Sequence, residues 1–144
     1  MKILDELIKD ASLSIPKLSK KINVNSSVVY SRIKRLIKRK IIESFIININ
    51  DSLLGFNVSA LIGLNIDSKI RDGVINELLK LEEVKEMSEI TGRFDLIILV
   101  KSKSLEDLHR LLSVKIGRIN GVSHSETFIE MKRHNIEGKY HLMD

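Results

Sequence analysis

The sequence predicts an α+β chain in two parts, and two observations predict it. Three short helical patterns occupy the first forty or so residues, and the third is strongly basic. From residue 56 the patterns follow the order strand, helix, strand, strand, helix, strand, which is that of the ferredoxin-like βαββαβ fold. We therefore expect a helix-turn-helix domain over residues 1–41, a linker strand and hinge over 42–55, and a ferredoxin-like domain over 56–144.

The first part has the start and stop signals of a helix-turn-helix. Helices are predicted over residues 1–10, 15–22 and 26–39. Ser14 is a good N-cap for the second helix, and Pro16 is tolerated in its first turn. Asn23 tolerates the left-handed conformation of a tight helix stop, and Asn25 caps the third helix. Two short helices joined by about three residues and followed by a basic helix describe this motif.

Positive charge is concentrated in the same part of the chain. The whole chain has a net charge of +5, but residues 1–50 hold 11 Lys and Arg against 4 Asp and Glu, a net +7. Between Lys17 and Lys40 there are nine cations and no acid, as expected of a face that binds a polyanion. A solvated helix face is the alternative, and the lack of Glu at helical spacing weakens it.

The third helix separates an apolar face from a polar one. Val29, Ile33, Leu36 and Ile37 fall on one side, which predicts packing on the other two helices. Small and cationic residues fall on the opposite side, which suits a helix in a DNA major groove. They are Ser27, Ser31, Lys34, Arg35 and Lys38. For Tyr30, packing at the edge of the core is an equal alternative. The predicted DNA-binding residues are Ser26, Ser27, Tyr30, Ser31, Arg32, Lys34, Arg35 and Lys38.

Two segments predict contacts beyond a single chain. Residues 41–50 are rich in β-branched residues and predict a strand, either a wing beside the basic helix or a hinge. Residues 96–100, "LIILV", are apolar without alternation, so the sheet face away from the helices needs a cover. A second copy of the sheet is the simplest cover, and we expect a homodimer or larger. The alternative is that the first domain folds back on the sheet.

Taken together, these residues resemble the Lrp/AsnC family of transcription regulators. "LSIPKLSKKINVNSSVVYSRIKRLIKRKIIESFIININDSLLG" has the spacing of the family's winged helix-turn-helix and linker strand. "VKEMSEITGRFDLIILVKS" and "GVSHSETFIEMK" are similar to its ligand-sensing domain. The resemblance implies a regulator that binds double-stranded DNA, assembles as dimers and often octamers, and binds an amino acid or similar metabolite between dimers, near the turn "TGRFD".

Carried over by position, the resemblance places six residues at the effector site: Gly92, Arg93, Phe94, Asp95, Ser125 and Thr127. A glycine turn exposes N–H groups to a carboxylate, and Asp95 suits an ammonium group. In the structural alternative, Gly92 only permits the turn and Asp95 only bonds to backbone amides. The chain departs from the family where Lys40 replaces the usual Gly and where Arg93 occupies a position that is often acidic or small.

Catalytic and metal sites are not predicted. There are no cysteines, and the candidate acid–base residues, His109, His124, His134 and His141, show no metal-ligand spacing and no Ser-His-Asp grouping. We expect a cytoplasmic protein that is not an enzyme, needs no cofactor and does not bind membranes. Two alternatives remain open: an architectural, nucleoid-associated protein without an effector, and, less favoured, an enzyme similar to the sirohaem decarboxylases.

Overall fold

The computed structural model describes residues 2–136, which form two compact units. The first contains the chain up to Ile49, and the second spans Asn50–Arg133. Each unit has its own hydrophobic core. None of the helices within residues 2–136 is long and apolar enough to cross a membrane.

The first unit contains the three predicted helices, which are α1 (Lys2–Lys9), α2 (Ile15–Ile22) and α3 (Ser26–Lys38). The predicted caps are confirmed. Ser14 accepts a hydrogen bond from the backbone N–H of Lys17, and Asn25 accepts one from that of Ser27. Asn23 has a φ of 54°, so it ends α2 in the left-handed conformation. These local signals fix the turn between α2 and α3.

The core of the first unit is small and covers only part of α3. Its fully buried members are Ile3, Leu7, Leu18, Val29 and Ile42. Val29, Ile33 and Leu36 of α3 pack into it as predicted, but the prediction for Ile37 is wrong because this side chain is 45% exposed. An α-helix advances about 100° per residue, which turns Ile37 roughly 80° away from Val29. It therefore lies outside the sector that α1 and α2 cover.

Lys40 ends α3 in a left-handed conformation, with a φ of 56°. The carbonyl of Leu36 accepts hydrogen bonds from the N–H groups of Ile41 and Ile42, at 2.9 and 3.2 Å. This reversal brings Ile42 back into the core, where it is buried. A non-glycine residue in this conformation costs about 1 kcal/mol or more. The lysine at position 40, where the family usually has Gly, is therefore under backbone strain that a glycine would avoid.

The predicted linker strand is not formed. Residues 43–50 are irregular, and the next regular element is a 3₁₀ turn at Asp51–Leu54. A strand requires a neighbouring strand to satisfy its N–H and C=O groups, and within residues 2–136 none pairs with this segment. Its apolar side chains are left exposed: Phe45, Ile46, Ile47 and Ile49.

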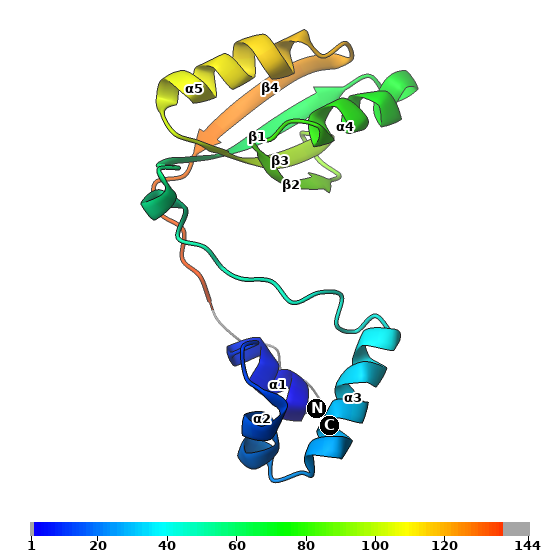
Figure 1. The fold of residues 1–144 in the computed structure, drawn as a ribbon. Helices are drawn as coiled ribbons and strands as arrows, with labels where there is room; N and C mark the ends of the chain where they lie inside the picture. The colour runs from blue at the N-terminus through cyan, green and yellow to red at the C-terminus, as the bar shows by residue number, and fades with distance from the viewer. Residues whose placement is uncertain (1, 137–144) are drawn as a thin grey trace. The chain divides into compact units, whose positions relative to one another are not determined.

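The second unit has the predicted βαββαβ order. Its elements are β1 (Val58–Ile66), α4 (Arg71–Leu79), β2 (Val84–Glu89), β3 (Leu96–Ser102), α5 (Leu105–Arg110) and β4 (Val122–Ile129). The strands form one antiparallel sheet in the order β2-β3-β1-β4. Both helices lie on the same side of this sheet (Figure 1). This arrangement confirms the predicted fold class.

Strand register divides the sheet into a helix-covered face and an open face. Ile62 pairs with Ile98, and both are buried in the core under α4 and α5. Neighbouring positions point the other way, so Leu61 and its partner Leu99 lie on the open face. The ring of Phe94 lies against Gly63 on this face, where an added Cβ would meet ring carbons at 2.5–2.6 Å. One glycine thus makes room for an aromatic ring on the open face.

We expect Gly63→Ala to destabilise the second unit by about 1–3 kcal/mol, because the methyl group displaces the Phe94 ring from a packed site. Gly73→Ala is the matched control, since its Cβ would meet nothing within 4 Å and an alanine within a helix is favoured by roughly 0.5–1 kcal/mol. Urea unfolding of the full chain measures both changes. Equal midpoints for Gly63→Ala and the unmodified chain would contradict this packing argument.

Candidate functional site

The outer face of α3 presents short polar side chains near its start and lysines further along. Ser27, Ser31, Lys34 and Lys38 lie opposite the buried Val29, and all four are exposed. Ser26, at the start of the helix, is exposed as well. The ring of Tyr30 is not in the core: it is 48% exposed, and the amine of Lys34 lies 4.8 Å from its centroid.

The cations of this unit differ in whether an acid pairs with them. Glu6 binds Lys21 at 2.9 Å and Lys9 at 3.4 Å, and these hydrogen bonds lower the pKa of the Glu6 carboxyl below its ordinary value. Within residues 2–136, no carboxylate forms a salt bridge with any of the six cations of residues 32–40. The charge of α3 is therefore left for an external polyanion.

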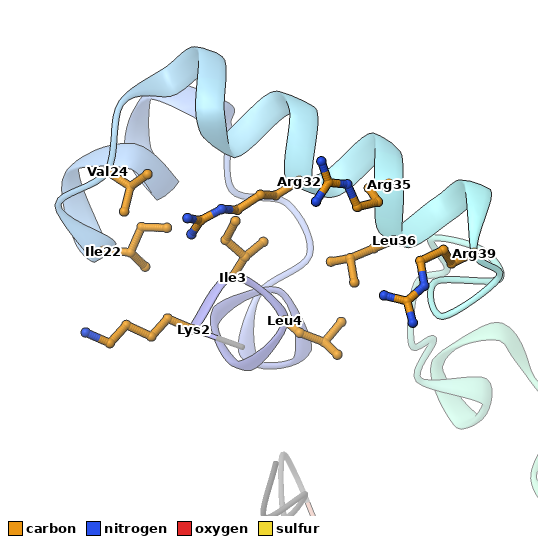
Figure 2. Close-up of a pocket in the computed structure, with 9 residues that line it drawn as sticks. All are labelled: Lys2, Ile3, Leu4, Ile22, Val24, Arg32, Arg35, Leu36 and Arg39. Carbon is orange, nitrogen blue, oxygen red and sulfur yellow. The ribbon is translucent and has the colours of Figure 1, made fainter. Parts of the chain in front are cut away.

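A hollow of about 480 Å³ lies along one flank of α3. Its floor is apolar and is formed by Ile3, Leu4, Ile22, Val24 and Leu36, with Lys2 beside them. Figure 2 shows Arg32, Arg35 and Arg39 of α3 along its edge. Arg35 thus lies with Arg32 on the flank, and the predicted position opposite the core is wrong for this residue. The predicted DNA-binding residues therefore form two groups, with Tyr30 beside Lys34. The outer group is Ser26, Ser27, Ser31, Lys34 and Lys38, and the flank group is Arg32 and Arg35.

The turn between β2 and β3 holds a second set of polar and aromatic residues. Gly92 has a φ of 133°, which favours glycine. Arg93 reaches Glu126 of β4, with 3.2 Å between the guanidinium nitrogen and the carboxylate oxygen, and lies 5.7 Å from the Phe94 ring. Phe94 meets Phe128 of β4 edge to face, with their centroids 6.4 Å apart. The turn is thereby joined to β4 across the open face.

Asp95 has a structural role at the end of this turn. Its carboxylate accepts a hydrogen bond from the N–H of Ile66 at 2.9 Å. Its own N–H donates to the carbonyl of Leu64, and its carbonyl accepts from the N–H of Ile90. The contacts with Ile66 and Leu64 join the turn to β1, as the structural alternative for Asp95 predicted. A contact with an effector stays a prediction for this residue.

The structure separates Ser125 and Thr127 from the open face. Ser125 pairs with Leu64 and Thr127 with Ile62, and these two partners are buried under the helices. Paired residues of antiparallel strands share a face, so both hydroxyls are on the helix side. Sequence reasoning missed Glu126 and Phe128, which do face the turn. Side chains alternate between the two faces of a strand, so this alternation along β4 could have indicated that Glu126 and Phe128 share a face.

Comparison with known proteins identifies the family. A family model described as the Lrp/AsnC ligand binding domain matches residues 59–139, and one described as a winged helix-turn-helix DNA-binding domain matches residues 1–43. This chain belongs to the Lrp/AsnC family. The HTH-type transcriptional regulator FL11 of Pyrococcus furiosus is 32% identical over 92% of this chain and 87% of the relative.

Solved structures agree with this Lrp/AsnC assignment. AsnC of E. coli is 26% identical, with a TM-score of 0.86 over 94% of this chain and 91% of that one. A transcriptional regulator from Neisseria meningitidis, solved as its L-Met complex, has a TM-score of 0.91 and 18% identity over 96% of this chain and 92% of that one, a likeness of fold. This Lrp/AsnC protein is thus a transcription regulator with a DNA-binding helix-turn-helix domain and a ligand-binding domain.

The candidate acid–base histidines of this Lrp/AsnC chain that the structure describes lie at separate places. No group of three or more His, Asp and Glu within residues 2–136 is arranged to hold a metal ion. His124 lies on the open face of the sheet, paired with Asn65, while His109 is exposed on α5. His134 is also exposed, and His141 lies outside the described residues. The relatives are named as transcriptional regulators.

We expect Asp95→Ala to destabilise the second unit by about 1–3 kcal/mol, because it leaves the N–H of Ile66 without its acceptor. Asp95→Asn keeps an acceptor oxygen and is expected to lose less. Hydrogen exchange at the Ile66 amide and urea unfolding measure the two effects. If Asp95→Ala unfolds at the same urea concentration as the unmodified chain, the carboxylate is not a structural support of the turn.

Proposed function

We propose that this Lrp/AsnC regulator binds double-stranded DNA through α3 and that an amino acid or similar metabolite changes its oligomeric state or its affinity for DNA. The observation that carries the first half is the unpaired positive charge of residues 32–40 on an exposed helix. The second half is supported by the match of residues 59–139 to a ligand-binding domain.

Each group of α3 has a distinct role in this proposal. The short hydroxyls of Ser26, Ser27 and Ser31 let the helix backbone approach base edges in the major groove. Lys34 and Lys38, further along the same face, reach bases or phosphates. Tyr30, which Lys34 covers, contacts the sugar-phosphate backbone. Arg32 and Arg35 bind phosphates from the flank, since Arg matches phosphate geometry in a bidentate manner.

The effector site is proposed at the turn formed by Gly92, Arg93, Phe94 and Asp95. The Arg93 guanidinium is exposed and forms an ion pair with the buried Oε2 atom of Glu126, which has no hydrogen-bond partner in the described structure. A ligand carboxylate competes for this guanidinium. Glu126 then offers its carboxylate to the ligand's ammonium group, a role that suits it better than Asp95, which bonds to β1. Ser125 and Thr127 are on the other face and enter only as more distant candidates. The L-Met complex of the Neisseria regulator supports an amino acid as the ligand class.

A second copy of this chain is the proposed oligomeric partner. The exposed apolar side chains of residues 45–49 have no strand partner in the described chain, and Phe128 on the open face is 49% exposed. Both surfaces are suited to a homodimer or a higher oligomer such as an octamer. Two copies of α3 related by a two-fold axis then match a pseudo-palindromic operator. We propose a cytoplasmic, non-enzymatic role, because the target is DNA.

A regulator and an architectural DNA-coating protein differ in specificity. We expect tighter binding to the DNA upstream of the protein's own gene than to random DNA of equal length, by about 10³-fold or more. We also expect one member of an amino-acid panel that includes L-methionine to shift this binding. Fluorescence anisotropy over a salt series measures both. Equal affinity for the two DNAs and indifference to every amino acid would instead support the architectural role.

We expect Lys34→Ala combined with Lys38→Ala to make the dependence of log affinity on log salt shallower by about 2, because each phosphate contact contributes roughly 0.9 to the slope. Lys69→Ala with Lys80→Ala is the matched control, since it removes the same charge from exposed positions of the second unit. DNA titrations at several salt concentrations measure the slope. An unchanged slope in the α3 variant, with its helicity intact, would exclude this face as the DNA contact.

A further inference from the structure

The second unit contains a polar hollow that neither the DNA-binding face nor the effector turn uses. It has a volume of about 370 Å³ and lies where β2 begins and β3 ends, beside α5. The turn with Gly92 joins the opposite ends of these two strands, so the hollow is separate from it. Its volume falls within the range of small-molecule sites, about 300–1,000 Å³.

Two polar atoms without partners line this hollow. The Ser102 side chain is buried, with 4% of the residue exposed, and its Oγ makes no hydrogen bond in the described structure. The Oε2 atom of Glu83 is also buried and unpartnered, while Lys115 binds the other oxygen of the same carboxylate. A buried polar atom without a partner loses the hydrogen bonds that it made to water in the unfolded chain. Both atoms therefore favour a hydrogen-bonding guest.

The charge of the Glu83 carboxylate defines what such a guest must supply. Burial works to raise the pKa of this carboxyl, but the hydrogen bonds from Lys115 and from the backbone N–H of Glu83 outweigh it together with the nearby lysine charges, so the pKa is lowered. At neutral pH the group is ionised, and its unpartnered oxygen requires a donor. The Ser102 hydroxyl either donates or accepts. A hydroxyl group on the guest satisfies both atoms.

The remaining charges of the hollow favour an anion. Five Lys and Arg and three Asp and Glu line it. Lys101 is paired with Asp51, and Arg110 with Asp107. Among residues 2–136 no carboxylate pairs with Lys85 or Lys103, although the Lys85 amine donates a hydrogen bond to the backbone carbonyl of Glu82 at 2.7 Å. Glu82 is the one lining carboxylate of the described chain without a cation. The net excess of positive charge disfavours a cation or a neutral zwitterion.

We propose that this hollow binds a small hydroxylated anion, either a hydroxycarboxylate or the phosphate ester of a polyol. The anionic group lies between the amines of Lys85 and Lys103, and hydroxyl groups bond to Ser102 and Glu83. The site is independent of DNA binding and of the amino-acid effector. It gives this Lrp/AsnC protein a metabolite site of a different chemical class from the proposed amino-acid effector site.

Nuclear magnetic resonance on the full chain tests the site. D-glycerate and glycerol 3-phosphate are the complete probes, since each has both an anionic group and hydroxyl groups. Inorganic phosphate and glycerol are the partial probes: phosphate supplies the anionic group alone, and glycerol the hydroxyl groups alone. We expect one of the two complete probes to shift the amides of Ser102, Lys103 and Leu111, and to bind about tenfold more tightly than inorganic phosphate. The probe that binds distinguishes a carboxylate from a phosphate ester.

Two variants and one control connect binding to the proposed contacts. Ser102→Ala removes a hydroxyl that makes no bond within the described chain, so the fold is retained, and affinity is expected to fall about fivefold. Lys103→Ala is expected to weaken binding about tenfold. Lys80→Ala removes an exposed lysine outside the hollow and leaves affinity unchanged.

Three outcomes overturn the proposal. Shifts confined to residues 91–95 or to α3 place the anion at another site. Equal affinity for inorganic phosphate, with Ser102→Ala binding as tightly as the unmodified chain, reduces the effect to general attraction of charge. No shifts up to roughly 10 mM of any probe, a concentration at which a dissociation constant of about 1 mM would be detected, mean that the hollow holds water alone.

Discussion

Burial of one side of each element is the constraint on which this structure depends. In the second unit, Ile62 and Ile98 are covered by α4 and α5, whereas Leu61 and Leu99 face away from the helices. In the first unit, Val29 is enclosed by α1 and α2, and Lys34 points outward. A chain of this size cannot cover both sides of every element. The uncovered sides are therefore where DNA, an effector or a second copy can bind.

The turn between β2 and β3 shows how packing prepares such a surface. Gly63 lacks a side chain, and the Phe94 ring occupies that space. Asp95 joins the turn to β1 through Ile66, which holds Arg93 over β4 beside Glu126. An exposed guanidinium held by rigid neighbours loses less side-chain entropy when it binds a carboxylate. The proposed effector site thus rests on contacts that are structural in themselves.

The cations of the first unit differ in whether a carboxylate pairs with them. Glu6 pairs with Lys9 within α1 and with Lys21 of α2, so the second of these ion pairs helps to join the two helices. The cations of α3 have no such partners in the described chain and form an outer group and a flank group. Lys40, held in a left-handed conformation, brings a further cation to the end of this helix. Strain at such a position is typical of functional surfaces.

The sequence by itself determined the helix caps, the left-handed Asn23, the βαββαβ order and the basic character of α3, because these depend on neighbouring residues and on periodicity. Only the tertiary structure decided the exposure of Ile37, the flank position of Arg35 and the irregular linker. It also placed Ser125 and Thr127 on the face opposite Glu126 and Phe128, and it assigned Asp95 to the backbone of β1. These features depend on which partner occupies each face, and distant segments of the chain supply those partners.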